Sequence, residues 1–219
     1  MTGVSGAAVF ALALSYFLGA IPFGLIVGKA RGVDIRNSGS GNIGATNVWR
    51  TLGPKAGALV FALDVAKGLA APLLARALVG DTHAVVATCA AFAILGHTFS
   101  FWLRFRGGKG IATGFGAMLG LVPWVALGCL AAWGLALAAS RMISVASIVA
   151  CIVAPIGAYL SGAPVSYQIV IGALALVALI KHIPNMKRIA QKTEPKIGQK
   201  STVDFDRPSA PTSNEAVSR

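Results

Sequence analysis

Long apolar segments separated by short polar segments make up most of the chain as far as about residue 190. A helix that crosses a bilayer needs about 20 residues. Six apolar runs meet or approach this length, namely 4–27, 56–78, 84–102, 111–139, 142–160 and 166–180. The pattern predicts an all-α, polytopic integral membrane protein.

The run 111–139 is long enough for either one tilted helix or two short ones. The sequence GLVPW within it favours a turn, because glycine and proline interrupt helices. If the run folds back, all of the 19 basic residues except Lys67 and Arg76 lie on one side of the membrane. If it crosses once, the basic residues from Lys181 onward face the opposite side. The positive-inside rule favours the first arrangement.

We therefore predict about seven transmembrane helices, with the N-terminus outside and the C-terminus in the cytoplasm. The first half of the run 111–139 would be only about 18 Å long as a helix. A re-entrant hairpin, which preserves the same sidedness, therefore stays open for this pair.

Composition agrees with a membrane location. Hydrophobic residues form 56% of the 219-residue chain and charged residues only 12%, which is too few charges to cover a soluble domain. No basic residue precedes Lys29, whereas a signal peptide begins with a positive region. Residues 1–190 are predicted to form the membrane-embedded domain. Residues 191–219, rich in Lys, Ser, Thr and Pro, are predicted to be a disordered cytoplasmic tail.

A polar, glycine-rich segment, NSGSGNIGATNVWR, occupies residues 37–50. Glycines let the backbone approach a ligand and adopt positive φ angles, and successive N–H groups in such a loop can bind an anion. Arg50 adds a planar fork suited to phosphate. The other candidate ligands in this segment are Ser38, Gly39, Ser40, Gly41, Asn42, Thr46 and Asn47. By itself the segment could also be a flexible cytoplasmic loop.

Two further polar segments fall on the same predicted side. In GHTFSFWLRFRGGKG (96–110), Arg106 and Lys109 bracket the pair Gly107 and Gly108; ordinary positive-inside charge is the alternative explanation. In KHIPNMKR (181–188), a histidine and an asparagine three residues apart would share a helix face if the last helix continues there. These residues are His182 and Asn185. Three polar segments on one side can converge on one anionic ligand.

Polar residues also occur inside the apolar runs. Asp64 and Lys67 are three residues apart and are expected to form a structural ion pair. Ser144 and Ser147 lie near the cytoplasmic end of their helix; they are expected to pack between helices or to reach the same site. His97 is expected to have a packing or capping role at a helix end. The three cysteines, which have no metal-binding spacing, are expected to be packing residues.

The segments 38–50, 96–110 and 182–188, in this order, closely resemble the three signature segments of the bacterial acyl-phosphate:glycerol-3-phosphate acyltransferase family. The pattern LDxxKG at 63–68 fits as well. The resemblance extends through about Glu194. It departs from the family at Ser100, where proline is common, and at Lys192, where glycine is usual; the second departure leaves the role of Glu194 open.

The resemblance implies a seven-helix membrane enzyme with an external N-terminus. It implies transfer of a fatty acyl group from acyl phosphate to the 1-hydroxyl of sn-glycerol 3-phosphate, giving lysophosphatidate and phosphate. Acyl-CoA and acyl carrier protein would not be direct donors. The positions it implicates in substrate binding or catalysis are Ser40, Thr46, Arg50, Lys109, Ser147, His182 and Asn185.

We expect His182, Asn185, Lys109 and Ser147 to take part in catalysis. No His-x4-Asp sequence is present, so either a substrate phosphate oxygen or His182 would accept the hydroxyl proton. We expect no cofactor, no metal and no nucleic-acid partner. The expected location is the cytoplasmic (inner) membrane, with the site facing the cytoplasm and membrane lipids around the protein.

Two other function classes fit part of the sequence. A transporter or channel for an organic phosphate would also use basic loops, but the sequence has no inverted repeat. A membrane scaffold that binds anionic lipids through its basic tail would not explain the glycines.

Overall fold

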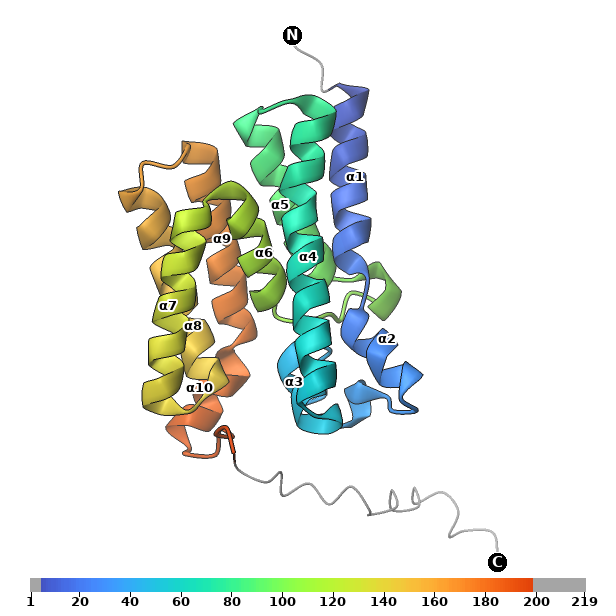
Figure 1. Ribbon diagram of the computed structural model, residues 1–219, viewed down its shortest axis with the longest axis vertical. Coiled ribbons are helices and arrows are strands. Elements are labelled where there is room, and N and C mark those ends of the chain that lie inside the picture. Colours follow the sequence, from blue (N-terminus) through green and yellow to red (C-terminus); the bar gives the residue numbers. More distant parts are fainter. Residues whose placement is uncertain (1–4, 199–219) are drawn as a thin grey trace, which may run out of the picture.

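The computed structural model describes residues 5–198, which form a bundle of helices with no strand in this range (Figure 1). The long helices are α1 (Gly6–Ala20), α4 (Pro54–Val79), α5 (His83–Thr98), α7 (Pro123–Ser140), α8 (Ile143–Leu160) and α9 (Val165–Lys181). The shorter ones are α2 (Phe23–Ala30), η1 (Ile35–Asn37), α3 (Ala45–Leu52), η2 (Phe101–Leu103), α6 (Ile111–Leu121) and α10 (Ile183–Ala190). The predicted all-α membrane fold is confirmed.

Five helical segments within residues 5–198 are long and apolar enough to cross a membrane. They are Gly6–Ala30, Pro54–Val79, His83–Leu103, Pro123–Ser140 and Ile143–Leu160. The helices α9 and α10 together form a possible sixth span, bent by 50°. The remaining apolar helix, α6, has 11 residues, or about 16 Å. The sidedness of the membrane and the exact number of crossings stay predictions.

The apolar run 111–139 is broken, as its sequence suggested. Helix α6 ends at Leu121, and Pro123 begins α7 after one intervening residue. The two helices run in opposite directions, and α1 begins at the end of the bundle opposite to α10 (Figure 1).

Small residues bring α4 and α6 into backbone contact. A Cβ on Gly68 of α4 would overlap the carbonyl oxygen of Thr113, and a Cβ on Gly116 of α6 would overlap that of Val65. Such close approach is typical of helices that pack within membranes. The short helix α6 is therefore fixed against the longest helix of the bundle, together with the loop that precedes it.

A small core anchors the glycine-rich segment 37–50 beside the lower half of α4. Ile35, Ile43 and Val48 are buried there against Val60 of α4 and Leu103 of η2. Apolar side chains thus alternate with the polar residues of the segment and hold it on the bundle.

The ordered chain continues past the boundary expected at residue 190. The N–H of Ile197 donates to the carbonyl oxygen of Arg141 at 2.8 Å, and the Arg141 side chain donates back to the Ile197 carbonyl oxygen at 3.0 Å. Glu194 is buried, with 4% of its surface exposed. Residues 191–198 therefore pack on the bundle; the rest of the predicted disordered tail, 199–219, lies outside the described residues.

Candidate functional site

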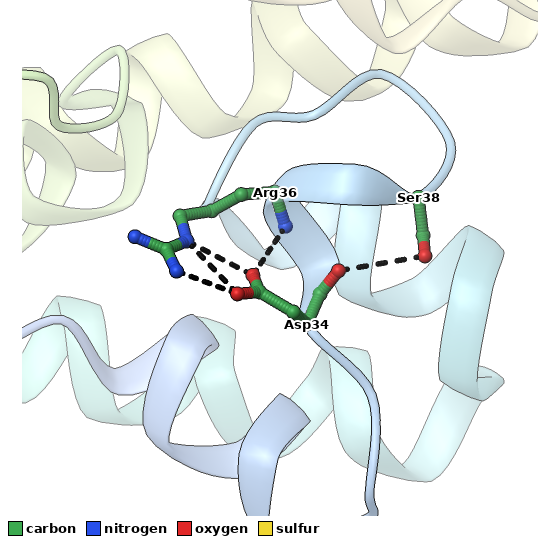
Figure 2. Close-up of polar contacts among 3 residues, drawn as sticks. All are labelled: Asp34, Arg36 and Ser38. Atoms are coloured by element: carbon green, nitrogen blue, oxygen red, sulfur yellow. Dashed lines mark hydrogen bonds and ion pairs between the residues drawn. The ribbon is translucent and has the colours of Figure 1, made fainter. Parts of the chain in front are cut away.

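The first polar segment begins with a turn built on Asp34. Its carboxylate accepts a hydrogen bond from the backbone N–H of Arg36 at 3.0 Å and pairs with the Arg36 guanidinium at 2.5 Å (Figure 2). Hydrogen bonds from Arg36 hold the pKa of Asp34 at about 2. The Ser38 hydroxyl donates to the Asp34 carbonyl oxygen at 3.5 Å. Arg36 is thus neutralised next to the segment and adds little positive charge to it.

Asn47 shapes the glycine-rich loop from within. Its Nδ2 donates to the carbonyl oxygens of Ile35 (2.9 Å) and Ser38 (3.0 Å), and its Oδ1 accepts from the N–H of Ser40 at 2.8 Å. Gly39 has φ +59°, and a Cβ there would overlap Asn47 Oδ1. Both amide hydrogens of Asn47 are therefore used inside the loop, so this side chain positions the loop and has no donor left for a ligand.

The other polar residues of this segment differ in whether their side chains are free to bind a ligand. Asn42 accepts from the N–H of Gly44 at 2.8 Å, ahead of α3. The hydroxyls of Ser40 and Thr46 have no hydrogen-bond partner among residues 5–198. The partly buried guanidinium of Arg50 likewise pairs with no side chain in this range. These three side chains remain open to an added ligand.

The glycine pair of the second segment lies directly on the end of α5. The N–H of Gly107 donates to Thr98 O and that of Gly108 to His97 O, both at 3.1 Å. A Cβ on Gly107 would overlap His97 O, and one on Gly108 would overlap His97 Nε2. The two N–H groups are therefore used within the protein, and the glycines serve to seat the loop that carries Lys109.

A buried polar cluster supports this loop from the other side. The predicted pair is confirmed, with Lys67 Nζ 2.7 Å from Asp64 Oδ1. The same ammonium donates to the carbonyl oxygen of Ile21 at 2.9 Å and lies 3.0 Å from His97 Nδ1. His97 thus packs against Gly108 with one ring edge and contacts Lys67 with the other.

The third segment is bent at His182. Helix α9 does not continue there, so Asn185 lies on α10 and the two residues flank a bend instead of sharing a face of one straight helix. His182 Nδ1 lies 2.8 Å from the carbonyl oxygen of Ala178. A carbonyl oxygen only accepts hydrogen bonds, so Nδ1 carries the proton of a neutral ring, and Nε2 has a free lone pair.

Hydrogen bonds join the second and third segments. Lys109 Nζ donates to Asn185 Oδ1. Asn185 Nδ2 donates to Glu194 Oε1 and Arg188 Nε to Glu194 Oε2, both at 2.7 Å. Burial raises the pKa of Glu194, but the hydrogen bonds from Asn185 and Arg188 outweigh it and hold the pKa below its ordinary value. Glu194 is therefore an ionised carboxylate at neutral pH.

Mutual electrostatic effects show that Arg50 belongs to the same cluster. Burial lowers the pKa of Arg50, while Glu194 raises it and Arg188 lowers it further. Burial also lowers the pKa of Lys109 to about 8, with Arg188 and Arg50 acting in the same direction and Glu194 against them. Three cations thus surround one carboxylate, which leaves an excess of positive charge in a half-buried site.

Two candidates share no hydrogen bond or ion pair with this cluster. Arg106 is exposed, and its side chain makes no hydrogen bond or ion pair within residues 5–198. Ser147 is buried in α8, donates to the Ile143 carbonyl oxygen at 2.9 Å and accepts from Trp133 Nε1 at 3.4 Å. Ser144, one turn earlier, lies beside the Glu194 carboxylate instead.

An apolar cavity of about 140 Å³ extends from the cationic cluster into the bundle. Lys109, Gly110 and Ala178 line it near the cluster, and the remaining lining comes almost wholly from apolar residues of α5, α6, α7, α8 and α9. The site therefore combines strong positive charge with space for an apolar group.

The sequence signals for the main cluster were basic residues beside glycines. These signals did not predict a role for Glu194, because it lies in a polar, charged stretch that resembles a tail. Its place in the site depends on Asn185 and Arg188 of α10, against which the chain folds back after that helix ends.

Comparison with known proteins identifies one family. The family model for glycerol-3-phosphate acyltransferase matches residues 9–192. A glycerol-3-phosphate acyltransferase of Symbiobacterium thermophilum is 44% identical over 188 residues, covering 86% of this chain and 94% of that protein. That of Rubrobacter xylanophilus is 45% identical over 195 residues, covering 88% and 96%.

Solved structures give the same result. The crystal structure of PlsY (YgiH), an integral membrane glycerol 3-phosphate acyltransferase, in its glycerol 3-phosphate form has a TM-score of 0.85 and 37% identity to this chain. It covers 88% of this chain and 96% of its own. The lysophosphatidic acid form has a TM-score of 0.83 and 36% identity, with the same coverage.

Proposed function

The chain belongs to the glycerol-3-phosphate acyltransferase family of membrane enzymes, and we propose that it transfers a fatty acyl group from acyl phosphate to the 1-hydroxyl of sn-glycerol 3-phosphate. The products are lysophosphatidate and phosphate, and the step is the first acylation of phospholipid synthesis. Acyl-CoA and acyl carrier protein are not direct donors in this proposal.

The observation that carries the proposal is the cationic cluster at the mouth of an apolar cavity. Both substrates bear phosphate, and Arg50 and Lys109 provide cations that the single carboxylate of Glu194 does not neutralise. The apolar cavity next to Lys109 accommodates part of the fatty chain of the donor. Preorganised cations at a site shielded from water orient phosphates and stabilise negative charge that develops during reaction.

The residues divide into those that touch substrate and those that position them. We assign phosphate binding to Arg50, Lys109 and the free hydroxyls of Ser40 and Thr46. Asn47, Gly107 and Gly108 shape the two loops, because their polar hydrogens are already used within the protein. Asn185 and Glu194 orient Lys109 and Arg188.

In the transfer step, the substrate hydroxyl oxygen forms a bond to the acyl carbon. The bond from that carbon to the phosphate oxygen then breaks, and phosphate leaves with its electron pair. Lys109 offsets the negative charge that develops. The hydroxyl proton passes either to Nε2 of His182, which has a free lone pair, or to a phosphate oxygen of the donor.

The end of the bundle that carries the three segments also carries most of the basic residues. By the positive-inside rule, we propose that this end faces the cytoplasm in the cytoplasmic (inner) membrane. Glycerol 3-phosphate would enter from water, and the acyl donor from the surrounding lipid.

An assay with the purified full-length protein in lipid tests the proposal. Labelled glycerol 3-phosphate is supplied with acyl phosphate in one reaction and acyl-CoA in another. We expect labelled lysophosphatidate from acyl phosphate alone. Product from acyl-CoA would overturn the donor assignment, and uptake of organic phosphate into sealed vesicles without product would favour a transporter.

A further inference from the structure

Arg76 joins four parts of the chain at the end of the bundle far from the cationic cluster. Its Nη1 donates to the carbonyl oxygen of Gly120 at 2.6 Å, and its Nη2 to the hydroxyl of Tyr167 at 3.2 Å. Its Nε donates to Asp81 Oδ1 at 3.1 Å. Since α4, the turn after it, the last turn of α6 and the first turn of α9 meet here, the guanidinium fixes their spacing.

The apolar cavity runs along α6 toward this clamp. Its lining residues recur on every turn of α6, from the start of the helix beside Lys109 to its last residue; they are Ile111, Gly114, Phe115, Ala117, Met118 and Leu121. From Ile111 to Leu121 the helix rises about 15 Å. The cavity therefore has one end at the cationic cluster and the other at the last turn of α6.

The residues at the far end are direct neighbours of those that Arg76 holds. Leu121 follows Gly120, and Ile171 lies one helical turn after Tyr167 on the same side of α9. Both line the cavity, and both belong to the main buried core, which also contains Tyr167 and Val86. Within residues 5–198, Lys109 is the one charged residue in the lining, and it lies at the other end, just before α6.

We infer that Leu121 and Ile171 form a stop for the end of the acyl chain, and that Arg76 and Tyr167 hold this stop rigid. The inference rests on the proposed function and adds to it the determinant of acyl-chain length. A chain that ends at or before the stop fits within the cavity. Each methylene beyond it must displace packed side chains, at a loss of roughly tenfold or more in affinity.

Alkyl phosphates of increasing chain length test the stop without the reaction, because they have no acyl group to donate. Binding to the purified full-length protein in lipid nanodiscs would be measured by competition with a fluorescent single-chain phosphate. The ratio of variant to wild-type affinity at each length removes the contribution of membrane partitioning. The same proteins would then be assayed with acyl phosphates of matching lengths.

The main variant is Ile171→Ala, with Ile169→Ala as its control, since Ile169 on the same helix is 65% exposed on the outer surface. We expect Ile171→Ala to favour chains about two methylenes longer, by about tenfold over wild type, and Ile169→Ala to leave the profile unchanged. Ile171→Val provides a milder enlargement if the alanine variant does not fold. Arg76→Lys loses the planar fork and should hold the stop less rigidly. Its affinity should therefore fall less steeply than that of the wild type for chains longer than the preferred length, while the preferred length itself stays the same.

The outcomes separate the two proposals. A length profile identical in wild type, Ile171→Ala and Ile171→Val overturns the stop, even if acyl transfer occurs. A shifted profile for alkyl phosphates with no transfer from any acyl phosphate overturns the proposed reaction and leaves the stop as a property of the lipid site.

Discussion

Replacing Lys67 by methionine tests how strongly the buried Asp64–Lys67 pair supports the site. The substitution leaves the carboxylate of Asp64 in the bundle without the ammonium that lies 2.7 Å away. Removing one partner of a buried ion pair costs about 3–5 kcal/mol. Protonating Asp64 would not avoid this loss of stability, because neutralising a carboxyl group of ordinary pKa at pH 7 costs about 4 kcal/mol, which is a free-energy cost of the same size.

A change of this size is measurable by thermal unfolding. For a chain of about this length, 1 kcal/mol shifts Tm by roughly 2–4 °C, so Lys67→Met should lower Tm by roughly 6–20 °C. Intrinsic tryptophan fluorescence of the purified protein in detergent follows the transition. The same variant should lose most acyl transfer, because His97 loses the contact that holds it against Gly108.

The double variant Asp64→Leu/Lys67→Met separates the two effects. With no charge left unpaired, it should recover at least half of the lost Tm. Activity should not recover with it, since His97 still lacks its lysine partner. The single variant Asp64→Leu completes the comparison. If the double variant loses as much Tm as Lys67→Met and Asp64→Leu lose together, the pair contributes no coupling and the reasoning is refuted.

Three other substitutions test the site. If His182 and not a phosphate oxygen of the donor accepts the hydroxyl proton, His182→Ala should lower kcat by about 10²–10⁴-fold with little change in KM for glycerol 3-phosphate; an unchanged kcat with a raised KM would exclude His182 as the base. Lys109 has a pKa lowered to about 8, so its positive charge is lost as pH rises through that value. kcat/KM should fall above about pH 8, and a pH–rate profile of Lys109→Arg should lack this fall; an identical profile would count against Lys109. Gly108→Ala should abolish most activity because its Cβ would overlap His97 Nε2, whereas Gly128→Ala, with nothing within 4 Å of the new Cβ, should keep wild-type rates and Tm.

The sequence was most informative where a local rule fixes the structure. Proline and glycine in GLVPW broke the long apolar run, as helix chemistry requires, and the three-residue spacing of Asp64 and Lys67 placed them on one helix face. Charge distribution grouped the three polar segments at one end of the bundle, where Arg50, Lys109 and the third segment meet.

Features that depend on distant partners could not be predicted in this way. Gly107 and Gly108 suggested a phosphate cradle, but the carbonyls that accept their N–H groups lie at the end of α5, on Thr98 and His97. Asn47 looked like a ligand because only the folded loop shows that its amide is already used. Glu194 lies in a charged, proline-containing stretch, and nothing local predicts that it becomes buried against α10.

The short helix α6 lies against the middle of α4. Gly68 of α4 meets Thr113, and Pro72 meets Gly120, whereas α4 continues to Val79 and begins about 21 Å before Gly68. In the proposed orientation, with α4 crossing a hydrocarbon layer of about 30 Å, we expect Lys109, just before α6, to lie below the lipid headgroups and inside the near leaflet. An acyl chain bound there would not leave hydrocarbon, which costs about 0.8 kcal/mol per methylene. The new lipid would then move sideways into the leaflet at the depth where its ester bond was made, while phosphate and glycerol 3-phosphate exchange with the water on that side.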